Sequence, residues 1–152
     1  MKILFVCLGN ICRSPMAEGL LRKRAAERDI PLTVDSAATS RWEVGNPPYP
    51  GTQEVLRKAG VDFSMMRARQ ITEDDFYRFD YIIGMDQNNL QDLKAIAPKE
   101  TKEKIFLYMN IVPGKEQTAI PDPWYTGDFQ ETYEMLTEGL DKWLDLFEKD
   151  AK

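Results

Sequence analysis

Residues 3–21 read ILFVCLGNICRSPMAEGLL and place an apolar run, a loop and a helix start within one short stretch. The apolar run ends at a cysteine and is followed by a glycine loop, which predicts a buried strand over residues 2–6. Apolar residues at helical spacing among charged ones predict an amphipathic helix over residues 15–28, with Ser14 as its cap and Pro15 in its first turn. A strand that leads through a loop into a helix is the first unit of an α/β fold.

The same alternation continues along the rest of the chain. Because strands and helices alternate, we expect a parallel sheet with helices on both faces and a binding crevice beyond the carboxyl ends of its strands. The pattern predicts strands over 32–37, 80–85 and 104–109, and proline-containing loops over 41–51 and 112–128. It predicts helices over 52–60, 72–79, 86–93 and from 129 onward, with Thr72 and Asp86 as caps of the second and third of these.

Composition limits the function classes. The chain has 20 Lys and Arg against 25 Asp and Glu, and its net charge of -5 argues against nucleic acid as the main partner. No apolar run approaches the roughly 20 residues of a membrane span, and the amino-terminal run lacks a secretory layout, so we expect a cytoplasmic protein. The sequence contains no histidine, which excludes Cys-His, Ser-His-Asp and His-metal mechanisms. Its two cysteines alone argue against a tetrahedral zinc site, so no metal is predicted.

The first loop has the composition of an anion site. Its backbone amides and the following helix amino terminus can surround an anion, and Arg13 adds a charged fork that matches phosphate oxygens. Gly9 permits close approach of the backbone to a ligand, and Asn10 tolerates a left-handed conformation. In such a site Cys7 is expected to be largely thiolate, a nucleophile suited to the phosphorus of a bound phosphate ester. The hydroxyl of Ser14 can donate to the sulfur and help it leave later.

The stretch VCLGNICRSPMAE resembles the active-site loop of the low-molecular-weight protein tyrosine phosphatases. The segments VDSAATSRWEVGNPP, ARQIT, FDYIIGMD and PDPWY occur in the family's order and spacing, so the resemblance covers nearly the whole chain. It implies a single phosphatase domain over residues 1–152, with a Rossmann-like three-layer fold, a four-stranded parallel sheet and no cofactor. It also implies Cys7 as nucleophile and Arg13 as phosphate ligand, within a phosphate loop made of Leu8, Gly9, Asn10, Ile11, Cys12, Arg13 and Ser14.

A proton donor must lie elsewhere in the chain. Without a histidine, the proton that the leaving group needs must come from a carboxyl. Asp122 lies between Pro121 and Pro123, which stiffen its backbone, and Trp124 and Tyr125 can shield it from water. From the residues alone, a turn aspartate before proline is the more common role. The resemblance implies that Asp122 is the general acid and then the general base, because the family's acid occupies this Asp-Pro position.

The resemblance also implies a substrate pocket. Trp42, Trp124 and Tyr125 would form walls for a flat aromatic phosphoester, so the implied substrates are phosphotyrosine proteins or peptides, with a cognate tyrosine kinase system as a further partner. Inorganic phosphate or a similar oxyanion would occupy the loop. Ordinary loop packing is the alternative role for each aromatic residue. The chain departs from the family at Met66, where a structural histidine is common, which leaves the local hydrogen bonding open.

Other residues have two roles left open. Cys12 either fills space in the loop or acts as a redox partner that closes a disulfide with oxidised Cys7. Asp35, Ser36 and Asp86 either terminate strands and cap a helix or hold the loop by hydrogen bonds.

Two other functions compete with phosphotyrosine hydrolysis. An arsenate reductase on the same fold would need further cysteines to relay electrons, and none follows Cys12. A catalytically silent phosphate- or phosphopeptide-binding module would not need all the catalytic residue types present here. The sequence therefore predicts hydrolysis of phosphotyrosine and aryl phosphate monoesters through a phosphocysteine intermediate.

Overall fold

The computed structural model describes residues 1–151. At its centre is a four-stranded sheet with the order β2-β1-β3-β4, in which all neighbouring strands are parallel. The strands are β1 (Lys2–Cys7), β2 (Thr33–Ala38), β3 (Tyr81–Gly84) and β4 (Ile105–Leu107). The α-helices are α1 (Arg13–Glu27), α2 (Pro50–Lys58), α3 (Glu73–Arg78), α4 (Gln87–Ile96), α5 (Pro123–Thr126) and α6 (Phe129–Asp150), and two 3-10 helices are η1 (Lys99–Lys104) and η2 (Tyr108–Ile111).

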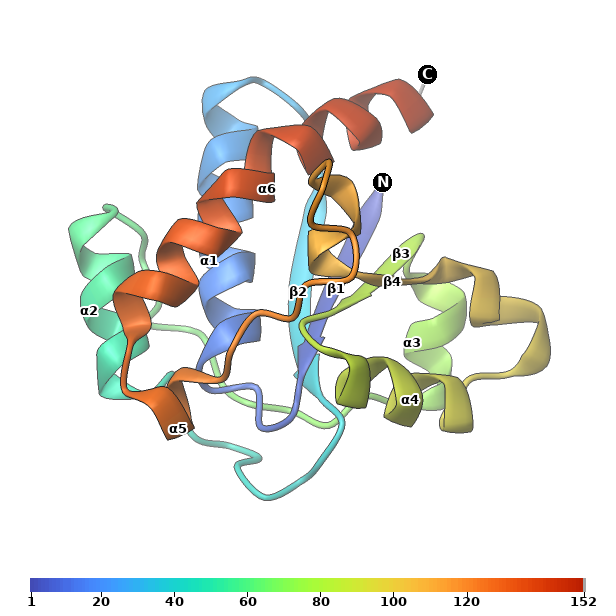
Figure 1. The fold of residues 1–152 in the computed structure, drawn as a ribbon, viewed down its shortest axis with the longest axis horizontal. Coiled ribbons are helices and arrows are strands. Elements are labelled where there is room, and N and C mark those ends of the chain that lie inside the picture. The colour runs from blue at the N-terminus through green and yellow to red at the C-terminus, as the bar shows by residue number, and fades with distance from the viewer. Residues whose placement is uncertain (152) are drawn as a thin grey trace.

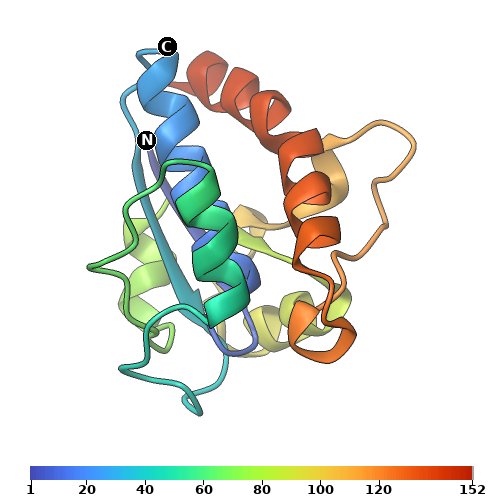
Figure 2. The same cartoon turned by 90° about the vertical axis from the view of Figure 1, so that its left-hand side faces the viewer.

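Helices cover both faces of the sheet, so the predicted three-layer α/β fold is confirmed. Helices α1, α2 and α6 contact one another on one face, while α3 and α4 lie on the other (Figure 1). The view turned by 90° shows α1, α2 and α6 in front of the strands (Figure 2). The central strand β1 serves both layers because successive side chains of a strand point to opposite faces. Ile3, Phe5 and Cys7 join the core under α1 and α6, whereas Leu4 and Val6 join the core under α3 and α4.

The order of the strands places a crevice at the end of β1. From β1 the chain adds β2 on one side and β3 on the other, and ligands of such sheets bind outside the carboxyl ends of the strands at this reversal. The segment after η2 returns to the same edge, where the amide of Ile120 donates to the carbonyl of Met85 at 2.9 Å. The loops that carry Cys7 and Asp122 therefore meet although they lie far apart in the sequence.

The start of α1 corrects the sequence-based prediction. The helix begins at Arg13 rather than at residue 15, and its N-cap is Cys12, which makes no side-chain capping bond. Ser14 is therefore inside the first turn and is not the cap. Its hydroxyl instead contacts the Cys7 sulfur and accepts from the Asn10 amide.

Other boundaries shifted as well. The predicted strand over 104–109 is shorter, because the chain turns into η2 at Tyr108. The predicted loop over 112–128 contains the short helix α5, which Asp122 caps by accepting a bond from the amide of Trp124. The predicted caps Thr72 and Asp86 are confirmed, and each forms a capping box with its third helical residue.

Candidate active site

The loop between β1 and α1 surrounds the Cys7 sulfur. Cys7 ends β1 and is buried, and its Sγ lies 3.1 Å from Ser14 Oγ. Among residues 1–151, the backbone amides of residues 9–14 donate no hydrogen bond to another residue. A concave set of free amides at a helix amino terminus is the usual backbone arrangement for binding an anion.

Asn10 fixes the shape of this loop. It adopts a left-handed conformation with φ 59, as its residue type permits. Its Nδ2 donates to Ser14 Oγ at 2.7 Å and to Ser36 Oγ at 2.9 Å, and its Oδ1 accepts from the amide of Arg69 at 3.0 Å. One side chain thus ties the loop to α1, to β2 and to the segment before α3.

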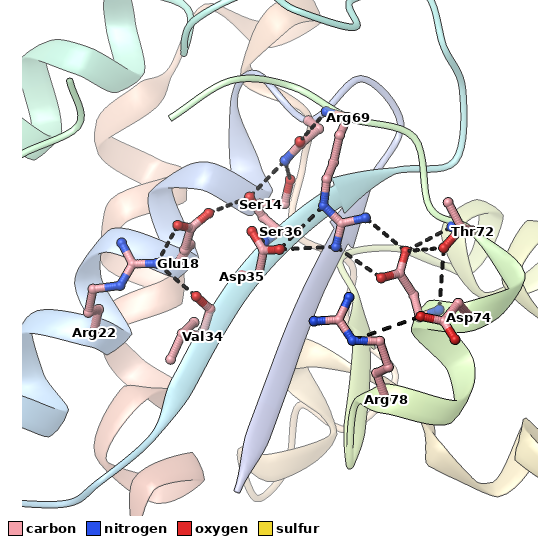
Figure 3. A network of polar contacts seen from close by, with 12 residues as sticks. Ser14, Glu18, Arg22, Val34, Asp35, Ser36, Arg69, Thr72, Asp74 and Arg78 are labelled. Atoms are coloured by element: carbon pink, nitrogen blue, oxygen red, sulfur yellow. Dashed lines mark hydrogen bonds and ion pairs between the residues drawn. The ribbon is translucent and has the colours of Figure 1, made fainter. Parts of the chain in front are cut away.

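The hydrogen bonds continue from Ser36 into the layer beneath the loop (Figure 3). Ser36 Oγ donates to Glu18 Oε1 at 2.6 Å, and Arg22 donates to Glu18 Oε2 at 2.5 Å and to the carbonyl of Val34 at 2.7 Å. Glu18 was not predicted as a site residue. Its sequence signals were its place in the first half of the helix after the loop and its membership of the stretch VCLGNICRSPMAE. Neither distinguishes it from a surface glutamate.

Arg69 forms a second support that the sequence did not single out (Figure 3). Its guanidinium donates to both oxygens of Asp75, at 2.8 and 3.1 Å, and to Asp35 Oδ2 at 3.0 Å. Asp35 therefore holds the segment that supports Asn10, one of the two roles left open for it. The only sequence signal for Arg69 was its membership of the segment ARQIT.

Arg13 is almost fully buried, with 1% of its surface exposed. Its Nη1 donates to Asp86 Oδ2 at 2.7 Å and to the carbonyl of Ile120 at 2.9 Å, and its Nη2 lies 3.5 Å from Asp122 Oδ2. Its Nε has no partner among the described residues. Burial alone would lower the pKa of Arg13, but the nearby Cys7 charge and the bond to Asp86 raise it above its ordinary value, so the group stays charged.

Asp86 and Asp122 each have two roles. Asp86 caps α4 through Oδ1, which accepts from Asn89, while Oδ2 binds Arg13. Asp122 caps α5 through Oδ1, while Oδ2 faces Arg13, and its side chain is 20% exposed. Each carboxylate therefore caps a helix with one oxygen and faces Arg13 with the other.

A pocket opens above Cys7, and the three aromatic residues predicted as walls all line it. Trp42 comes from the loop after β2, and Trp124 and Tyr125 come from α5. Glu43, which was not predicted, also lines this pocket together with Asp122. The structure thus brings the nucleophile candidate, the carboxyl candidate and the aromatic walls to one cavity.

Cys12 is buried beside this site. Both cysteines are free thiols, and Cys12 packs with Ile11 and Ala68 in a small apolar cluster. Burial, followed by the charges of Cys7 and Asp122, raises the pKa of Cys12 to about 12.

Met66, where the family often has a histidine, is buried in the core and packs against Gly19 of α1. Its side chain therefore makes an apolar contact at this position.

Two features are absent from residues 1–151. No helix there is long and apolar enough to cross a membrane. No group of three or more histidine, cysteine, aspartate or glutamate side chains in this range could hold a metal ion.

Comparisons with known proteins agree on one family. The family model described as low molecular weight phosphotyrosine protein phosphatase matches residues 2–152. The chain is 41% identical over 153 residues to the low molecular weight protein-tyrosine-phosphatase YfkJ of Bacillus subtilis, covering 99% of this chain and 98% of that protein. It is also 41% identical over 152 residues to PtpA of Staphylococcus epidermidis, covering 98% of this chain and 95% of that protein.

Solved structures give the same result. The crystal structure of YfkJ from Bacillus subtilis superimposes with a TM-score of 0.96, covering 100% of this chain and 97% of that one. The low molecular weight protein tyrosine phosphatase SP-PTP from Streptococcus pyogenes is 43% identical, with a TM-score of 0.83 and coverage of 95% of this chain and 91% of that one. The chain belongs to the low-molecular-weight protein tyrosine phosphatases and is a phosphatase enzyme.

Proposed function

We propose that this phosphatase hydrolyses phosphotyrosine in proteins and peptides, and other aryl phosphate monoesters, through a phosphocysteine intermediate on Cys7. The observation that carries the proposal is the state of Arg13. Its charged guanidinium is buried, yet its Nε has no partner among residues 1–151. A buried charged donor without a partner is costly, and a bound phosphate oxygen would satisfy it.

The loop supports the same ligand. The amides of residues 9–14, which donate to no other residue of the described chain, would surround the remaining phosphate oxygens. Leu8, Gly9 and Ile11 line the pocket directly above the sulfur. Charge that develops on the phosphoryl oxygens would be stabilised by donors already in place, which is the largest source of catalysis in many enzymes.

The first chemical step transfers the phosphoryl group to the enzyme. The Cys7 thiolate attacks phosphorus, an S–P bond forms, and the P–O bond to the aryl group breaks. Asp122 donates its proton to the departing phenolic oxygen. Its position on the pocket wall supports this role.

The second step returns the enzyme to its starting state. The Asp122 carboxylate takes a proton from water, the water oxygen bonds to phosphorus, and the P–S bond breaks. Inorganic phosphate leaves and the Cys7 thiolate is regenerated. Ser14 Oγ, 3.1 Å from the sulfur, can donate to the departing thiolate.

The walls support an aromatic substrate. Trp42, Trp124 and Tyr125 offer flat apolar faces above the sulfur, and stacked or edge-on aromatic contacts favour a phenyl ring over an aliphatic chain. Phosphotyrosine formed by a cognate tyrosine kinase is therefore the proposed substrate. We also propose one phosphatase domain over residues 1–152 that acts in the cytoplasm, where its two free cysteines stay reduced.

Two variants test the mechanism with p-nitrophenyl phosphate and a series of aryl phosphates. Cys7→Ser should lose turnover, and a wild-type rate would overturn the proposal. Asp122→Ala should slow esters of poor leaving groups most, because these need the proton most. Asp128→Ala is the matched control, since Asp128 also caps a helix but does not line the pocket. A loss in Asp122→Ala that does not depend on the leaving group would remove Asp122 from this role.

Cys12 is the proposed redox partner of Cys7. Peroxide converts the Cys7 thiolate to a sulfenic acid and releases hydroxide, and the Cys12 thiolate then displaces a second hydroxide to form the disulfide. Oxidation removes the Cys7 charge, which is one of the causes that raise the pKa of Cys12. Because attack needs the Cys12 thiolate, disulfide formation should be faster as pH rises.

Mass spectrometry after mild peroxide treatment tests this role. We expect a Cys7–Cys12 bond and activity that dithiothreitol restores, whereas Cys12→Ala should lose activity irreversibly. A wild-type protein without this bond after treatment would contradict the proposal.

A further inference from the structure

Exposed apolar side chains gather around the mouth of the catalytic pocket. Eight large apolar side chains are exposed among residues 1–151. Five of them line the pocket or one of two grooves that adjoin it: Trp42, Tyr49, Ile96, Trp124 and Tyr125. Scattered exposed apolar residues need no explanation, but a gathered set marks an interaction surface.

The first groove lies between the loop after β2 and helix α4. Leu8 and Trp42 line both this groove and the catalytic pocket, so the two spaces adjoin. Ala95 and Ile96 complete the groove from α4, and 53% of Ile96 is exposed. We call it the α4 groove.

The second groove lies between the proline-containing loop before α2 and helix α5. It shares Ile11 and Trp124 with the catalytic pocket, and Pro47 and Tyr49 form its far side. The Tyr49 ring meets Trp124 edge-on, with centroids 5.1 Å apart, so the two rings pack against each other without a ligand. We call it the α5 groove, and Figure 1 shows α4 and α5 on either side of the loop that follows β1.

The charge of this surface is uniform. Apart from the Cys7 thiolate, every charged side chain that lines the pocket or the two grooves is a carboxylate: Glu43, Asp92 and Asp122. A ligand that lies across both grooves would meet apolar surface rimmed by negative charge. Acidic side chains would be repelled there, and apolar ones would lose water-exposed area.

We infer that the α4 and α5 grooves bind the residues on either side of phosphotyrosine in an extended segment of a protein substrate, and that they select apolar over acidic side chains. The inference rests on the proposed function, since the phosphotyrosine ring must occupy the central pocket. Both grooves share lining residues with that pocket, which favours the substrate chain as their occupant. Preformed aromatic and proline walls reduce the ordering cost of binding.

The test compares two phosphotyrosine peptides that differ only in the flanking residues, leucine in one and aspartate in the other. We expect kcat/KM to be at least about tenfold higher for the leucine peptide, because two partly buried side chains contribute. Ile96→Asp and Pro47→Asp should each lower kcat/KM for the leucine peptide about fivefold to tenfold, since each removes part of one apolar contact and adds a charge. Neither should change turnover of p-nitrophenyl phosphate, which has no flanking residues. Met65→Asp is the control, because Met65 is 89% exposed and lines neither groove.

Several outcomes would overturn the inference. Equal kcat/KM for the two peptides with normal turnover of p-nitrophenyl phosphate would refute it alone. No turnover of p-nitrophenyl phosphate by the wild-type enzyme would instead refute the proposed function, and the inference with it. A loss in Met65→Asp as large as in Ile96→Asp would show a nonspecific charge effect. A wild-type dimer in light scattering that Ile96→Asp dissociates would assign the surface to a second copy of this chain.

Discussion

Replacing Arg69 by methionine should destabilise the protein by an amount that the structure allows us to work out. The substitution removes four hydrogen bonds of 2.8–3.3 Å, two to Asp75 and two to Asp35. Only 2% of the Asp75 side chain is exposed, and loss of one partner of a buried ion pair costs about 3–5 kcal/mol. Asp75 keeps its bonds to the amide and hydroxyl of Thr72, and the Asp35 side chain is 45% exposed, so each loss is partly offset. We therefore expect the free energy of unfolding to fall by about 2–3 kcal/mol.

The effect should depend on pH in a defined direction. Burial alone would raise the pKa of Asp75, but Arg69 and Thr72 outweigh burial and hold it below its ordinary value. A carboxyl whose pKa is lowered by folding stabilises the protein above its unfolded pKa, and this contribution is lost as pH falls through the folded value. The difference between wild type and Arg69→Met should therefore be complete near neutral pH and shrink below about pH 4.

Urea unfolding at several pH values, with slopes compared to confirm a two-state transition, measures this difference. Arg78→Met is the control, because Arg78 is an exposed arginine of the same region whose nearest carboxylate, on Asp74, lies 3.9 Å away. The control should change stability by less than about 0.5 kcal/mol. A loss in Arg69→Met no larger than in the control, or one that stays constant down to acid pH, would refute the reasoning.

Three further substitutions have defined outcomes. Ser14→Ala removes the hydroxyl next to the Cys7 sulfur, so hydrolysis of the phosphoenzyme should slow about tenfold. Stopped-flow traces should then show a burst of p-nitrophenol, and an unchanged kcat would contradict this. Asp86→Asn removes the carboxylate charge that pairs with the buried Arg13, and an asparagine that caps α4 through its oxygen turns its Nδ2 toward the guanidinium. We expect kcat/KM to fall about tenfold or more and Tm to fall as well, and an unchanged kcat/KM in steady-state assays would contradict this. Gly51→Ala would place a Cβ 2.5 Å from the Phe129 ring. Overpacking costs about 1–3 kcal/mol, above the helix-propensity gain of up to about 1 kcal/mol, so chemical denaturation should show a net loss.

The order of elements was predictable because it follows from local pattern. Apolar runs and helical spacing identified all four strands and the main helices, and Thr72 and Asp86 were correctly predicted as caps. The errors occurred where a long-range contact competes with a local preference. Ser14 is a good capping residue, but its hydroxyl contacts Cys7 and Asn10, so the helix begins earlier.

Residues that support the loop between β1 and α1 from other parts of the chain could not be found from apolar runs and helical spacing. Glu18 and Arg69 are ordinary charged residues in the sequence, and their roles depend on the partners that folding brings to them. Glu18 meets Ser36 only because α1 packs against β2, and the amide of Arg69 meets Asn10 across 59 positions of sequence. No local pattern encodes such pairings.

The sequence by itself determined the chemistry that this protein can perform. Its lack of histidine and its one Cys-to-Arg loop define the candidate nucleophile and anion ligand, since these roles depend on residue type and local spacing. The candidate acid at the Asp-Pro position came from the family resemblance. Only the tertiary structure decided how those groups are held. Asp86 and the carbonyl of Ile120 hold the Arg13 guanidinium by its Nη1, while its Nε has no partner among residues 1–151. These partners reach Arg13 from distant loops that meet at the carboxyl edge of a parallel sheet.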